Sequence, residues 1–177
     1  PRARQTQPAQ SNIAHPLTRS SFFTRSDNLW YNTRRGEFEM QATRRQAREW
    51  AIQMLTAADL NPPENISEMM ADFWENLADT KSPMPALKAF AEERVVGVLE
   101  KQETIDEVLA KLLEKWDIYR LGTVERAVLR MGIWEMDYSD VPKPVVINEA
   151  IDLTNWFATP KSRTLINGIL DKHANGD

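Results

Sequence analysis

The sequence predicts an all-α fold, a compact bundle of about seven helices. From Thr43 onward, apolar residues recur three and four positions apart, which is the spacing of one helix face. No segment alternates between apolar and polar residues with a period of two, as a half-buried strand would. Prolines and capping residues divide the chain into pieces of helix length. At 177 residues, the chain has the size of one domain.

Helix caps and prolines set the boundaries expected for the first four helices. Asn61-Pro62-Pro63 stops the first helix after Asp59. The four expected starts are about Arg44, Asn65 with Glu68 as a capping-box-like pair, Ser82 to Pro85, and Thr104 with Glu107 as a capping box.

The last three helices are delimited in the same way. Their expected starts are near Thr123, at about Val145 behind Pro142 and Pro144, and at Pro160 with Thr159 as N-cap. The sixth helix ends near Phe157 and the seventh near Ala174. Gly168 falls in the middle of the seventh helix, where glycine costs about 1 kcal/mol relative to alanine. We explain this cost by another helix crossing closely there.

Charge is distributed unevenly along the chain. The formal net charge is −4, and residues 1–39 hold six arginines and three acids, so the remaining residues carry −7. A domain this acidic needs a local basic patch or a basic partner to bind nucleic acid. There is no cysteine, which excludes disulfides and favours a reducing cytoplasm. No apolar run is long enough for a membrane span.

The first 39 residues have a different composition from the rest. They are rich in Arg, Gln, Ser, Thr and Asn, and their aromatic residues follow no helical or strand period. We therefore expect residues 1–39 to be a disordered extension and residues 40–177 to form the helical domain. Met40 stands where amphipathic order begins, and we expect it to be the native initiator.

Three arginines at the start of the first helix form the first candidate binding group. Arg44, Arg45 and Arg48 lie three and four residues apart, so we expect their guanidinium groups to emerge side by side, away from the face of Ala47 and Ala51. The planar fork of arginine suits phosphate oxygens. The alternative is a solvated charged face.

The first turn of the seventh helix is the second candidate. It carries Lys161, Ser162, Arg163 and Thr164, and two cations with two hydroxyls at a helix start can seat a phosphate. The alternative is ordinary helix capping.

The sequence gives catalysis little support. His15 and His173 are the only histidines, and neither has partners at the spacing of a triad or a metal site. The six glycines are scattered singly, so no phosphate-binding loop occurs. We expect no enzyme activity, no cofactor and no metal.

Four phrases of the sequence resemble the NusB family of bacterial transcription antitermination factors. They are TRRQAREWAIQML (43–55), VERAVLRMGIWEM (124–136), VINEAIDL (146–153) and LINGILDK (165–172). The resemblance implies an all-helical domain that binds boxA RNA of nascent ribosomal RNA together with the small-subunit ribosomal protein NusE. It implies a role in the antitermination complex of RNA polymerase.

The resemblance also assigns residues to these partners. It places Arg44, Arg45 and Arg48 on RNA, together with the turn of Lys161 to Thr164, and implies that the two groups form one surface. It places Glu125 on the ribosomal partner. Thr56 departs from the family pattern, because relatives often have an aromatic residue there, which puts base stacking at this position in doubt.

Two other interpretations stay open. A NusB-like module also forms the RNA-binding head of some ribosomal RNA cytosine methyltransferases, and this chain could be such a detached head. It could also be a helical protein-interaction module without RNA affinity, as its acidic composition suggests.

Overall fold

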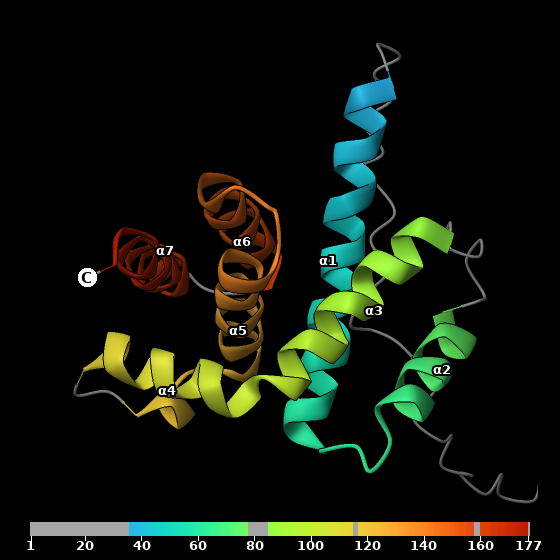
Figure 1. The fold of residues 1–177 in the computed structure, drawn as a ribbon, viewed down its shortest axis with the longest axis horizontal. Helices are drawn as coiled ribbons and strands as arrows, with labels where there is room; N and C mark the ends of the chain where they lie inside the picture. The colour runs from blue at the N-terminus through green and yellow to red at the C-terminus, as the bar shows by residue number, and fades with distance from the viewer. Residues whose placement is uncertain (1–35, 78–84, 115–116, 158–159, 177) are drawn as a thin grey trace, which may run out of the picture. The chain divides into compact units, whose positions relative to one another are not determined.

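The computed structural model describes residues 36–77, 85–114, 117–157 and 160–176, and within these ranges the chain is helical with no strand (Figure 1). The predicted all-α fold is confirmed. The elements are α1 (Gly36–Leu60), α2 (Ile66–Leu77), α3 (Pro85–Glu100), α4 (Gln102–Leu113), a 3₁₀ turn η1 (Ile118–Arg120), α5 (Thr123–Tyr138), α6 (Lys143–Phe157) and α7 (Pro160–Asn175).

The N-terminal part of α1 differs from the prediction. The helix begins at Gly36, eight residues before the expected start at Arg44, so residues 36–39 are helical and not disordered. Residues 1–35 of the predicted extension lie outside the described residues. Met40 falls inside α1.

Helix α5 is the centre of the bundle. Every residue from Arg126 to Met136 is buried, whichever face of the helix it occupies. Helices α1, α3, α4, α6 and α7 all pack against α5, and Figure 1 shows it between α1 and α7. A helix enclosed on all sides must bury its polar positions too, and α5 buries Arg126, Arg130 and Glu135.

One buried ionic cluster ties the start of α5 to α1 and α4. Arg130 donates to Asp59 at 2.7 Å and binds both oxygens of Asp106 at 2.8 Å. Arg126 binds the other oxygen of Asp59 and donates to the carbonyl of Leu121 at 2.7 Å. Each buried charge thus has an opposite partner and hydrogen bonds, as burial in a low-dielectric interior requires.

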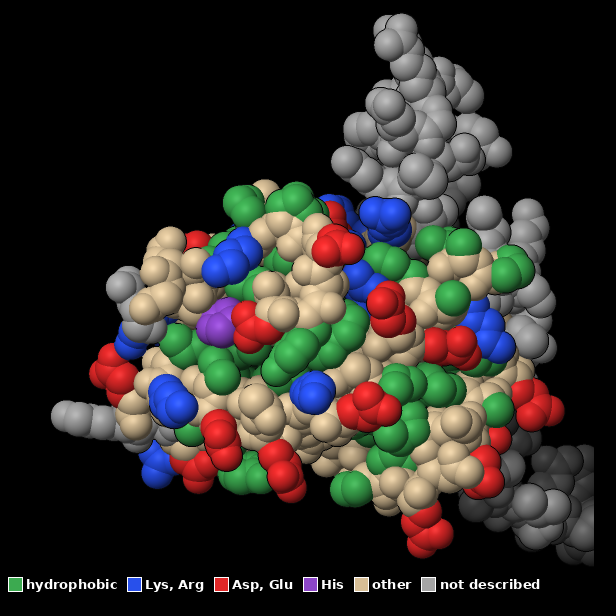
Figure 2. Space-filling view, in the orientation of Figure 1, with side chains coloured by type: hydrophobic (Ala, Val, Ile, Leu, Met, Phe, Trp, Pro, Cys, Tyr) green, Lys and Arg blue, Asp and Glu red, His purple; other side chains and the backbone are tan. Residues whose placement is uncertain are grey.

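Outside the core, charges of both signs are interspersed. On the face seen in Figure 2, acidic and basic side chains are interspersed with apolar ones, and acidic side chains predominate along the lower edge. No helix among the described residues is long and apolar enough to cross a membrane.

The helix starts test the capping predictions. Asn65 caps α2 as predicted, because its Oδ1 accepts from the backbone N–H groups of Ser67 and Glu68 at 2.9 and 3.3 Å. The capping box at Thr104 is wrong. Helix α4 begins two residues earlier, at Gln102, because only Lys101 separates it from α3, which ends at Glu100.

The glycines correct another expectation. A Cβ added at Gly168 would meet nothing within 4 Å, so no helix crosses closely there. The close approaches lie elsewhere. A Cβ at Gly97 would clash with the buried ring of Trp134, and one at Gly132 would lie 3.0 Å from Leu170.

These two environments predict opposite effects of the same substitution. Gly97→Ala should lower the free energy of unfolding by about 1–3 kcal/mol, because the buried Trp134 ring has to move. Gly168→Ala should raise it by about 0.5–1 kcal/mol, since alanine is the better helix former and the space is open. Urea unfolding measures both. A stabilising Gly97→Ala would contradict the close α3–α5 packing.

The Asp59 cluster predicts a dependence of stability on acid. Burial alone would raise the pKa of Asp59, but the hydrogen bonds and charges of Arg126 and Arg130 outweigh it and hold the pKa below the ordinary value of 3.8. The folded state therefore favours the charged form. The resulting stability is complete above the ordinary value and is lost as pH falls through the lowered one.

Asp59→Asn should accordingly flatten the loss of unfolding free energy as the pH falls below the ordinary pKa of 3.8. Urea unfolding at a series of pH values measures this. Parallel loss in the wild type and the variant would show that other carboxylates cause the acid sensitivity.

Candidate nucleic-acid interface

The three predicted arginines of α1 lie at three different depths. Arg44 is exposed, the Arg45 side chain is 38% exposed, and the Arg48 side chain is only 5% exposed. The expectation that all three point away from the core is therefore wrong for Arg48. Arg48 stands four and seven residues before the buried Ile52 and Leu55, which places it on their face of the helix.

Arg48 belongs to a second buried ionic cluster, built around Glu135 of α5. Its Nε donates to both carboxylate oxygens of Glu135 at 3.0 and 3.1 Å. Arg94 of α3 binds the same carboxylate, which is 1% exposed, and its Nη1 donates to the carbonyl of Phe90 at 3.0 Å. Burial lowers the pKa of Arg94, and the charge of Glu135 opposes this.

Arg45 faces α6 and is bound there by two acids. Its Nε and Nη2 donate to the carboxylate of Glu149 at 3.1 and 3.0 Å. Its Nη2 also lies 2.6 Å from Asp152 Oδ2. A carboxylate near the start of a helix ordinarily interacts with the positive end of the helix dipole. In the structure Glu149 instead binds arginines, since Arg48 Nη1 also lies 3.8 Å from it.

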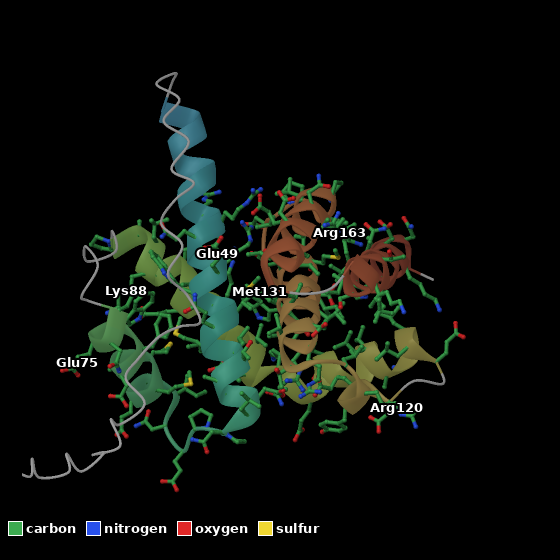
Figure 3. The ribbon with its side chains drawn as sticks, turned by 180° about the vertical axis from the view of Figure 1, so that it is seen from behind. Glu49, Glu75, Lys88, Arg120, Met131 and Arg163 are labelled. Carbon is green, nitrogen blue, oxygen red and sulfur yellow. The ribbon has the colours of Figure 1, made fainter. Side chains whose placement is uncertain are left out.

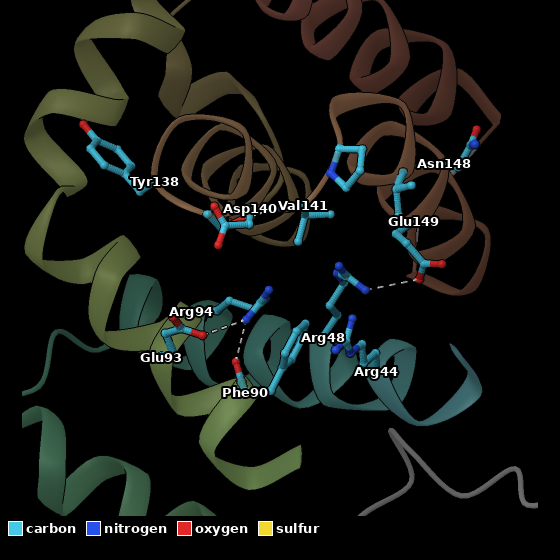
Figure 4. Close-up of a pocket in the computed structure, with 13 residues that line it drawn as sticks. Arg44, Arg48, Phe90, Glu93, Arg94, Tyr138, Asp140, Val141, Asn148 and Glu149 are labelled. Carbon is cyan, nitrogen blue, oxygen red and sulfur yellow. Dashed lines mark hydrogen bonds and ion pairs between the residues drawn. The ribbon is translucent and has the colours of Figure 1, made fainter. Parts of the chain in front are cut away.

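The arginines gather around the ring of Phe90 in a groove between α1, α3 and the α5–α6 turn (Figure 4). The guanidinium carbons of Arg94, Arg48 and Arg44 lie 3.1, 5.2 and 5.7 Å from the ring centre. Since Arg94 covers the ring so closely, Phe90 positions guanidinium groups by cation–π contact and is poorly placed to stack on a base.

The groove is large but electrically balanced. Its volume is about 630 Å³. Its charged lining consists of Arg44, Arg48, Arg94, Glu93, Asp140 and Glu149. Three cations thus face three carboxylates. Of the three arginines, only Arg44 forms no ion pair with a described side chain.

The second predicted group lies on the first turn of α7. Lys161, Arg163 and Thr164 are exposed there, while Ser162 donates to Glu125 Oε1 at 2.8 Å. This hydrogen bond joins the predicted RNA turn to the residue predicted to bind the ribosomal partner. A hollow of about 350 Å³ lies beside the bond, lined by Arg120, Leu121, Gly122, Glu125, Lys161, Ser162 and Leu165.

The two basic groups are anchored at different points along α5. Arg48 meets Glu135 near the end of α5, whereas Ser162 meets Glu125 in its first turn. Ten helical residues separate the two anchor points, about 15 Å along the axis. Figure 3 shows Arg163 beside α6 and α7 and Glu49 on α1, on the other side of α6. That the two groups form one surface stays a prediction.

Sequence reasoning missed the residues that hold the arginines in place. Arg94 and Glu135 stand at no spacing that marks a site, and Phe90 fits an ordinary apolar stripe. The phrase VERAVLRMGIWEM does carry a signal, since its charges at 126 and 130 are four residues apart inside a strongly apolar segment. Thr56 offers no stacking surface, and its buried hydroxyl has no hydrogen-bond partner among the described residues.

Fold and site together define an all-helical protein whose candidate ligand contacts are arginines, a lysine and hydroxyls. No cluster of potential metal ligands occurs in the part of the chain that the structure describes. Residues 45–175 match the NusB family. The chain belongs to this family.

Its relatives include curated proteins and solved structures. It is 42% identical to the transcription antitermination protein NusB of a Nitratiruptor species, over 73% of this chain and 90% of the relative. It is 40% identical to that of Desulforamulus reducens, over 73% and 87% of the two chains.

Two solved structures share the fold. The structure of T. maritima NusB superposes with a TM-score of 0.67 and 28% identity, covering 75% of this chain and 90% of the other. A structure of antitermination factors NusB and NusE in complex with dsRNA gives a TM-score of 0.67 and 28% identity, covering 78% and 100%. The two curated relatives are named as transcription antitermination proteins.

The burial of Arg48 predicts a large cost for its removal. Arg48→Ala should lower the free energy of unfolding by about 3 kcal/mol, because it leaves the buried Glu135 with Arg94 as its remaining described partner. Arg44→Ala, four residues away on the same helix but exposed, should change stability by less than about 0.5 kcal/mol. Urea unfolding compares the two variants. Equal, small effects would contradict the buried cluster.

Proposed function

We propose that this protein is a bacterial transcription antitermination factor that binds boxA-type RNA of nascent ribosomal RNA together with the ribosomal protein NusE. It joins both to the RNA polymerase antitermination complex in the cytoplasm and catalyses no reaction. The observation that carries this proposal is the 42% identity to a transcription antitermination protein NusB over 90% of its length. The match to a NusB bound to NusE and dsRNA supports it further.

The RNA contacts divide by burial. Arg44 is exposed and forms no described ion pair, so it offers its donors directly to a phosphate. Arg45 binds RNA in competition with its acids, and Arg48 acts mainly by holding α1 against α5. Lys161, Ser162, Arg163 and Thr164 provide a second contact at the start of α7, where backbone N–H groups add to the cations.

Glu125 is the proposed contact for NusE. It lies in the first turn of α5, beside the exposed Arg120 and the half-buried Ser162. The acidity of the chain after residue 39 favours a basic partner. Because Glu125 and Ser162 are hydrogen-bonded, the proposed contact for NusE adjoins the proposed RNA contact on α7.

The relatives and the charge of the groove also bear on the two alternative functions. The two curated relatives, 42% and 40% identical to this chain, are named as antitermination proteins, which favours an antitermination factor over the head of a methyltransferase. The balanced charge of the groove favours a protein-interaction module without RNA affinity, and a binding experiment decides between that module and the proposed function.

Fluorescence titration of boxA RNA, with and without NusE and at several salt concentrations, tests the proposal. Wild-type protein should prefer boxA to a scrambled strand. Arg44→Ala should weaken RNA binding and flatten the slope of log affinity against log salt by roughly 0.7, the value for one lost single-strand phosphate contact. Glu125→Lys should weaken NusE binding more than it changes binding to RNA alone.

Three outcomes would contradict the proposal. Failure of the wild type to bind boxA RNA, even with NusE, would leave the protein-interaction module as the better function. Equal affinity for boxA and the scrambled strand would show that the RNA binding is nonspecific electrostatic attraction. Unchanged NusE affinity in Glu125→Lys would move the partner surface elsewhere.

A further inference from the structure

Arg45 is partly exposed, and its N–H donors already bind carboxylates of the protein itself. A guanidinium has five N–H donors in a fixed fork. The edge formed by Nε and Nη2 is occupied by Glu149, and Nη2 also meets Asp152 at 2.6 Å. A phosphate that approaches this edge finds carboxylate oxygens already in the positions that its own oxygens would take.

The electrostatic surroundings of Arg45 agree with this geometry. Its hydrogen bond to Glu149 raises the pKa of Arg45; burial opposes this, and the charges of Glu149, Asp152 and Glu49 add to the rise. Burial also raises the pKa of Glu49, with a contribution from Glu149. The guanidinium thus lies in the field of three carboxyl groups.

The two acids that touch Arg45 differ in what else they do. Glu149 is 15% exposed and also lies 3.8 Å from Arg48, so it belongs to the buried framework. Asp152 is 42% exposed and forms its one described ion pair with Arg45. An ion pair this exposed contributes little to stability, because water and salt screen it.

We propose that Asp152 is an affinity-determining residue, which occupies a phosphate position on Arg45 and must be displaced when RNA binds. This inference rests on the proposed function, and it adds a residue that contacts no RNA itself. Asp152 acts through Arg45, as an internal competitor for the phosphate backbone. Its effect is therefore on affinity and not on the choice of sequence, since phosphate contacts position RNA without reading bases.

Asp152→Asn tests the proposal, because it keeps the size of the side chain and removes the charge. Affinity for boxA RNA should rise about threefold, the scale of one exposed ion pair. The salt slope should stay near the wild-type value, because Arg45 contacts the phosphate in both complexes. Affinity for a scrambled strand should rise by the same factor, and the melting temperature should fall by no more than about 3 °C, because the lost ion pair is worth under about 1 kcal/mol.

Two controls separate this competition from a general change in charge. Asp72→Asn makes the same chemical change on α2, which Figures 1 and 3 show on the opposite side of α1 from α6, and it should leave RNA affinity unchanged. In an Arg45→Ala background, Asp152→Asn should have no further effect, because the coupling between the two residues is what the double-mutant cycle measures.

The outcomes separate this inference from the proposed function. Unchanged affinity in Asp152→Asn, with a wild type that binds boxA, overturns the inference and leaves the function standing. An equal gain in Asp72→Asn, or a gain that persists without Arg45, also overturns it in favour of a general charge effect. A wild type that binds no RNA, with or without NusE, overturns both.

Discussion

The carboxylate of Glu135 is the group on which the arrangement of α1, α3 and α5 depends. It is almost completely buried, and an uncompensated buried charge costs several kcal/mol. Arg48 from α1 and Arg94 from α3 both bind it, so neither helix can shift along α5 without leaving a charge unpaired. At the other end, Asp59 and Arg126 hold α1 against α5 in the same way.

This constraint decides which arginines can reach a ligand. Once Arg48 is fixed to Glu135, the preceding turn of α1 is fixed too, with Arg44 turned to solvent and Arg45 to the acids of α6. The buried Glu135 cluster therefore fixes where the arginines of α1 lie. The carboxylates of α6 determine how strongly Arg45 can attract an anion. A site assembled in this way is ordered before RNA arrives, which reduces the entropy lost on binding.

Much of the fold could be predicted from the sequence, because helical periodicity and proline breaks are local signals. The starts of α2, α3, α5 and α7 agree with the capping and proline arguments, with the clearest case at Asn65. The errors at Thr104 and Gly168 have a different origin. Both residues belong to a local sequence pattern that fits more than one structure. The α3–α4 junction and the open side of α7 are set by tertiary contacts.

The residues of the candidate site were predictable from the sequence, but how deeply each side chain is buried was not. The spacing of Arg44, Arg45 and Arg48 identified the basic group, yet the same spacing places Arg48 in line with Ile52 and Leu55. A charge on an apolar stripe indicates a buried pair only when its partner is known, and Glu135 lies 87 residues away. Such long-range ion pairs carry no local sequence signal.

The separation of the two basic turns shapes how they can act on one RNA strand. Their anchor points on α5, Glu135 and Glu125, are about 15 Å apart along the helix axis. Sites this far apart without shared partners contribute additively. The α7 turn is the one joined to Glu125, so a partner bound at Glu125, as proposed, would act on that turn directly and on the α1 turn only through α5.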